Sequence, residues 1–170
     1  MLAGIGHRVP GSLIMRGCAD RLTVEEVERV PLEENAAARQ RLTETIESLG
    51  DEGLNRPIDN GWTVAAVLAE MAFWDRWAQT LVHRWRSGGM PPPMMPDWYD
   101  DAINRTLLPT WQALDGASAA RLALSAADDA DFEIRRTETP VLAAILAAGQ
   151  VNLLNRYVPR NAGLDRIERA

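Results

Sequence analysis

Glu70 is the residue whose type and setting most suggest chemistry. It lies in a segment of helical periodicity and is closely followed by Phe73, Trp74 and Trp77. A carboxylate on such an apolar face must find a partner or stay protonated. We weigh two compatible roles for it: a polar group in a shallow binding pocket beside Trp74, or a carboxylate neutralised by an arginine such as Arg160. Pairing is the commoner fate of a buried charge, so it is the preferred interpretation.

Other polar groups give weaker signals. The segment 83–86 holds one histidine and two arginines, which suit an anion, but positive charge near the end of a helix also complements its dipole, and we favour that role. The three aspartates of the segment 128–131 occupy neighbouring helical positions and point in different directions. They do not converge as calcium ligands do, so we expect a solvated face.

Composition narrows the class of protein. The chain has 170 residues, with 46% hydrophobic residues, 25% charged residues and a net charge of −6. This mixture is typical of one globular domain, and the negative charge argues against a nucleic-acid-binding protein, which normally carries a basic face. The one cysteine, Cys18, cannot form an internal disulfide, and its weakly patterned setting does not favour a reactive thiol. No cofactor is predicted.

The amino-terminal residues lack the pattern of the rest. They contain no continuous apolar run of the kind found in signal peptides, and no run of 18 apolar residues elsewhere suggests a membrane span. We therefore expect a cytoplasmic protein without membrane association. We divide it into a loosely ordered tail at 1–21, for which Met15 is an alternative start, and a helical domain at 22–170.

Helical periodicity recurs along the chain, and strand alternation does not. Helices are expected at about 32–49, 63–86, 97 onward, 118–136, 139–148 and 159–170, with a short one at 23–30. Gly50 and Thr63 suit a carboxy-terminal and an amino-terminal cap, and Ser118 and Thr139 are the expected caps of two later helices. Several amphipathic helices with short connections favour an all-α fold, an antiparallel four-helix bundle with short extra helices.

The helix at 63–86 has the strongest pattern. Its apolar residues step by threes and fours, which indicates one buried seam: Val64, Val67, Met71, Trp74, Ala78, Leu81 and Trp85. We expect Met71 and Leu81 to be largely buried. At this spacing, core packing explains the tryptophans better than ligand stacking does. Trp98 and Tyr99, which follow a proline-rich segment, are better candidates for a cavity mouth or a dimer contact.

Two segments carry a family resemblance. Residues 61–64 read Gly-Trp-Thr-Val, residues 68–75 read Leu-Ala-Glu-Met-Ala-Phe-Trp-Asp, and residues 156–169 read Arg-Tyr-Val-Pro-Arg-Asn-Ala-Gly-Leu-Asp-Arg-Ile-Glu-Arg. This order resembles the metal-binding DinB-like (YfiT-like) superfamily, whose patterns are Gly-Trp-Ser/Thr, Leu-Ala-His-Leu-Ala-Phe-Trp-Asp and a closing helix with two histidines. The resemblance spans roughly residues 32–170. It implies a four-helix bundle, often dimeric, with three histidines around a divalent metal.

This sequence departs from the family at the metal ligands. The three histidine positions fall on Glu70, Pro159 and Gly163, and neither proline nor glycine has a donor side chain. We therefore expect no metal, and binding residues Glu70, Trp74 and Arg160 around the family's metal position. Asp75 would have no metal ligand to orient.

Two functions remain open. The preferred one is a metal-free bundle that binds a small apolar molecule or a protein partner. The alternative is a thiol-dependent S-transferase or isomerase, like relatives that use mycothiol or bacillithiol, in which the metal activates the thiol.

Overall fold

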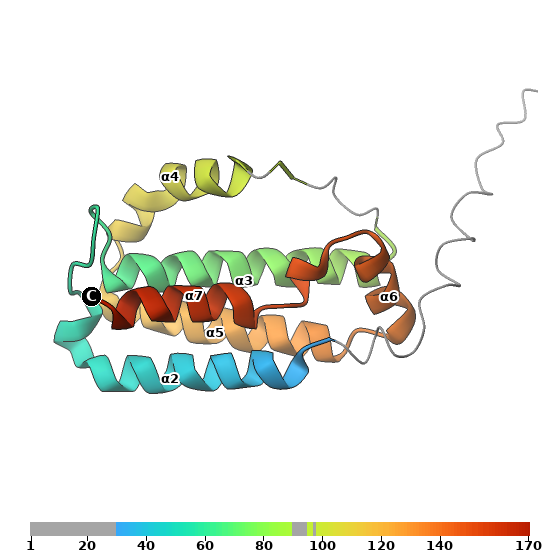
Figure 1. Ribbon diagram of the computed structural model, residues 1–170, viewed down its shortest axis with the longest axis horizontal. Coiled ribbons are helices and arrows are strands. Elements are labelled where there is room, and N and C mark those ends of the chain that lie inside the picture. Colours follow the sequence, from blue (N-terminus) through green and yellow to red (C-terminus); the bar gives the residue numbers. More distant parts are fainter. Residues whose placement is uncertain (1–29, 90–94, 97) are drawn as a thin grey trace, which may run out of the picture.

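The computed structural model describes residues 30–89, 95–96 and 98–170, and this part of the chain is helical, without a β-strand (Figure 1). The prediction of an all-α fold is confirmed. The elements are α2 (Leu32–Leu54), α3 (Val64–Arg86), α4 (Trp98–Gln112), α5 (Gly116–Arg135), α6 (Thr139–Ala147), the 3₁₀ helix η2 (Val151–Leu153) and α7 (Tyr157–Glu168). The predicted tail at 1–21, with Cys18, and nearly all of the predicted helix at 23–30 lie outside the described residues.

Helix α3 is central to the packing. It lies against α5 and α7, and α2 also packs on α5 and α7, so that four helices run side by side in Figure 1. Helix α4 packs on α3 at the outer edge of this group. Within the described part of the chain, no helix combines the length and the hydropathy that crossing a membrane requires.

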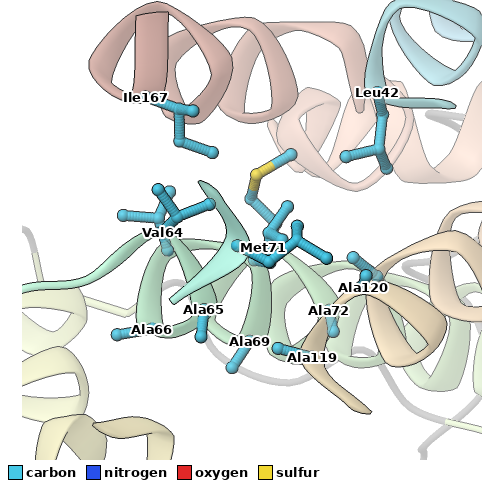
Figure 2. Packing of buried hydrophobic residues seen from close by; sticks show 14 of the residues in the cluster. Leu42, Val64, Ala65, Ala66, Ala69, Met71, Ala72, Ala119, Ala120 and Ile167 are labelled. Carbon is cyan, nitrogen blue, oxygen red and sulfur yellow. The ribbon is translucent and has the colours of Figure 1, made fainter. Parts of the chain in front are cut away.

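Small side chains bring α3 and α5 close together. A seam of mostly small residues along α5 is fully buried: Ala119, Ala123, Ala126, Ala130 and Ile134. Figure 2 shows Ala119 and Ala120 beside Ala72 of α3, whereas the longer side chain of Met71 points away from them, toward α7. Alanine leaves little side chain between two backbones, so these helices approach closely and bury apolar surface along their shared length.

The seam of α3 is partly as predicted. Met71 is buried, with 6% of its surface exposed, but Leu81 is only half-buried, and its neighbour Val82 is the fully buried residue. The core face includes Ala78 and Val82, which leaves Leu81 at the edge beside a cavity. Leu81 still packs against the core, but it is less completely buried than Met71 and Val82.

One of the predicted amino-terminal caps is observed and another is not. Thr63 is the amino-terminal cap of α3, since its hydroxyl accepts the amide of Ala66 at 3.1 Å. Helix α5 is capped by Asp115, whose side chain accepts a hydrogen bond from the backbone N–H of Ser118 at 2.8 Å. The predicted Ser118 cap is therefore wrong. Gly116 makes this earlier start possible, because a Cβ there would lie 2.5 Å from Cβ of Leu54.

Three further boundaries differ from the predicted ones. Gly50 has the expected positive φ of 60°, but a helical segment resumes after this kink and continues to Leu54. Thr139 is the first residue of α6 and Glu138 precedes it as the cap. Helix α7 begins at Tyr157, so Pro159 lies in the first turn, where a missing amide hydrogen costs no helical hydrogen bond.

Candidate functional site

A buried ionic network lies where α3, α5 and α7 meet. Asp75 of α3 is 1% exposed and accepts hydrogen bonds from two arginines. Its Oδ1 lies 2.8 Å from Nε of Arg156, and its Oδ2 lies 2.8 Å from Nε of Arg160. Arg160 also pairs with Asp131 of α5, at 2.9 Å between Nη2 and Oδ1. Two carboxylates and two guanidinium groups thus balance one another inside the protein, as buried charges must.

The guanidinium of Arg160 is almost fully engaged. Besides its two carboxylates, it donates to the backbone carbonyls of Asn35 and Ala127, both at 3.2 Å. Burial acts to lower the pKa of Arg160, but the charges of Asp75 and Asp131 outweigh that effect and raise it. Arg160 therefore holds α2, α3, α5 and α7 together and has little capacity left for a ligand.

Glu70 is not paired with Arg160, so this predicted ion pair is wrong. Its Oε1 instead accepts from Nδ2 of Asn104 at 2.6 Å, and Oδ1 of Asn104 accepts from the indole nitrogen of Trp74 at 3.1 Å. This chain of contacts joins α3 to α4. Burial raises the pKa of the Glu70 carboxyl, and the charge of Arg166 only partly opposes the rise.

Glu70 faces a cavity of about 310 Å³ between α3, α4 and α7. Trp74 and Arg160, the other two predicted binding residues, line the same cavity. So do Pro159 and Gly163, which means that all three positions at which the resemblance expects histidines meet at one place. The cavity is thus formed by residues far apart in the chain, and its wall combines an indole ring, a carboxylate and an amide.

Met71 occupies the space that a side chain at position 163 would need. A Cβ built on Gly163 would lie 2.7 Å from the sulfur of Met71 and 3.1 Å from its Cγ, well inside van der Waals contact. Glycine at 163 therefore permits close packing of α7 on α3. A larger residue there would require Met71 to move.

A second cavity, of about 490 Å³, adjoins the first. The two share four lining residues, Trp74, Asp100, Arg156 and Pro159. Trp98 and Tyr99, the predicted mouth residues, do not line either cavity; Trp98 is 65% exposed and its ring lies 5.8 Å from that of Tyr99. The next residue of α4, Asp100, lines both.

The two weaker sequence signals have partners in the structure. Glu133, which is buried, lies 2.8 Å from Arg86 and 3.3 Å from His83, so this end of α3 is held by a carboxylate. Of the three aspartates, Asp128 and Asp129 lie at the surface and pair with arginines, as a solvated face allows. Asp131 is buried in the ionic network, and the prediction of a solvated face is wrong for this residue.

Sequence reasoning missed the central role of Asp75. A readable signal existed, since Asp75 lies four residues after Met71 and three before Ala78, and so on the buried face of the same helix. A buried aspartate predicts a buried cation, and the two candidates, Arg156 and Arg160, are four residues apart, at the cap and in the first turn of α7. Which arginine would meet which carboxylate depended on helix packing.

Within the described residues, no group of three or more histidine, cysteine, aspartate or glutamate side chains is arranged to hold a metal ion. Comparison of the chain with protein-family models, with curated proteins and with solved structures returned no match.

Proposed function

We propose that this protein is a metal-free bundle of the DinB-like type, built on α2, α3, α5 and α7, that binds a small molecule in the cavity beside Glu70. The observation that carries the proposal is the convergence of Glu70, Pro159 and Gly163 on that cavity. Two distant segments supply these positions, and they meet at the place where the resemblance puts the metal. A cavity of about 310 Å³ is near the lower end of the range for small-molecule sites, roughly 300–1,000 Å³.

The buried ionic network holds the cavity wall together through charge pairs. Asp75, Arg156 and Arg160 join α3 to the start of α7 beside the cavity, and Asp131 extends the link to α5. These contacts hold the cavity wall in place without a metal.

A titration followed by NMR tests the proposal. We expect 1-hexanol, a small and mostly apolar probe, to shift the indole N–H signal of Trp74 in a saturable way, because this group lies beside the cavity and donates to Asn104. The variant Ala162→Phe places a ring at the cavity from the exposed side of α7 and should abolish the shift. Ala147→Phe, at an exposed position of α6, is the matched control. A wild-type protein without saturable shifts would refute the proposal.

One observation favours the enzymatic alternative, a thiol-dependent S-transferase or isomerase. A carboxyl whose pKa is raised above its ordinary value is better suited to exchange a proton with a bound thiol, and burial raises the pKa of Glu70. Consumption of mycothiol or bacillithiol with an electrophilic acceptor tests it. Activity that is lost in Glu70→Gln and kept in Glu47→Gln, an exposed position of α2, would favour the enzyme over the binding protein.

The resemblance also leads us to propose a cytoplasmic homodimer. The exposed indole of Trp98 on α4 makes this helix the first candidate for the contact. Light scattering should give twice the mass of one chain, and Trp98→Ser should shift the equilibrium toward the monomer. A monomer at high concentration would refute this proposal.

A further inference from the structure

The positive charges around the cavity are already neutralised. Arg160 lies between Asp75 and Asp131, and Arg156 pairs with Asp75 and donates to the carbonyl of Asn152 at 2.9 Å. Arg166 lies 2.6 Å from Asp59, with its guanidinium 4.4 Å above the ring of Trp62. An anionic ligand would have to compete with these carboxylates for every arginine on the wall.

The carboxylate on the wall has no comparable partner. Among the described contacts of Glu70, the hydrogen bond comes from the neutral amide of Asn104, and no ion pair within 4 Å neutralises it. The indole of Trp74 lines the same cavity, and an indole ring attracts cations through its π electrons.

We propose that the ligand of this cavity is a small organic cation, an alkylammonium whose charged head lies at Glu70 and whose apolar chain lies along Trp74. This inference rests on the proposed function and adds the chemical class of the ligand. The charge of Arg166 acts on Glu70 without a close ion pair, so the ammonium would supply a direct counter-charge, and its N–H groups would donate to the carboxylate oxygen that Asn104 leaves open. Such charge-assisted hydrogen bonds are stronger than neutral ones.

Three probes that share a chain length and differ in head group test the proposal by calorimetry. They are n-hexylammonium, 1-hexanol and hexanoate, at about pH 8, where the amine is charged. We expect hexylammonium to bind at least about tenfold more tightly than hexanol, as for a hydrogen bond to a charged group. Glu70→Gln keeps the oxygen that Asn104 contacts and should reduce this ratio to about one.

The controls separate the two proposals. Glu47→Gln removes one negative charge from an exposed position of α2 and should leave the ratio unchanged. Ala162→Phe should remove the binding of both probes. Equal binding of hexylammonium and hexanol, or tightest binding of hexanoate, would overturn the cationic ligand and leave the small-molecule site standing. Absence of binding by all three would overturn both.

Discussion

Asp75 and Arg160 lie 85 positions apart in the chain and meet in the interior at 2.8 Å, each almost completely shielded from water. The contact joins α3 to α7, and Arg156, four residues before Arg160, reaches the other oxygen of the same carboxylate. The cavity beside them is therefore held by an ion pair that is shielded from water. Each charge in the pair is stabilised mainly by its partner.

Removal of Asp75 should destabilise the protein strongly. Asp75→Ala leaves two buried guanidinium groups short of a counter-charge, and breaking a buried pair in this way typically costs about 3–5 kcal/mol. Urea denaturation measures the loss. Asp165→Ala is the control, because Asp165 pairs with Arg41 at the surface, where the cost should be about 1 kcal/mol or less. Equal losses in the two variants would contradict the role of Asp75.

The apolar face of α3 gives a second prediction. Val82 is fully buried, whereas Leu81 lies half-buried beside the larger cavity. Val82→Ala should cost about 2 kcal/mol of unfolding free energy, and Leu81→Ala should cost less although it removes more atoms. Denaturant midpoints at an unchanged slope report the difference. A larger loss for Leu81→Ala would mean that α3 is rotated relative to the structure described here.

The raised pKa of Glu70 predicts how stability depends on pH. A carboxyl whose pKa is higher in the folded state than in the unfolded state destabilises the fold at a pH where it is ionised in both states. This penalty is absent below the ordinary pKa of glutamate. It grows as the pH rises from that value to the raised pKa of the folded state, and it is complete above the raised pKa. Glu70→Gln should therefore melt at a higher temperature than the wild type at neutral pH.

The difference between these two proteins should shrink below about pH 4, where Glu70 becomes protonated in both the folded and the unfolded state. Thermal scans across this range, with Glu47→Gln as the exposed control, measure it. A wild type that is more stable than Glu70→Gln at neutral pH would show that an unrecognised cation neutralises the carboxylate.

The metal positions give a fourth prediction. Protein purified without an affinity tag should retain no stoichiometric zinc or nickel after dialysis, because Glu70 offers a donor and Pro159 and Gly163 offer none. Elemental analysis checks this. Bound metal that is lost in Glu70→Ala would refute it.

A restored histidine triad provides the converse test. Replacing Glu70, Pro159 and Gly163 together by histidine should fail to bind zinc while Met71 fills the space beside position 163. Adding Met71→Ala to the triad makes room for the imidazole and should permit binding. Zinc binding by the triad alone would show that Met71 moves aside at little cost.

The sequence by itself determined the helical class and most of the helices. The spacing of Val64, Val67 and Met71 along α3 fixes one apolar face, and local chemistry at Thr63 fixes where that helix begins. Such features depend on neighbouring residues, so they can be read before the chain is folded. Glu70 was found as a candidate for the same reason, since a carboxylate stands out against the apolar pattern of its helix, and Trp74 lies one turn after it.

The tertiary structure alone decided the partners. Arg160 was expected at Glu70 and is held instead by Asp75 and Asp131, because the packing of α7 against α3 and α5 brings those carboxylates within reach. The exposure of Leu81 was decided in the same way, by a small rotation that periodicity does not resolve. Contacts between distant residues depend on how helices are rotated and packed together, and no spacing along a single helix contains that information.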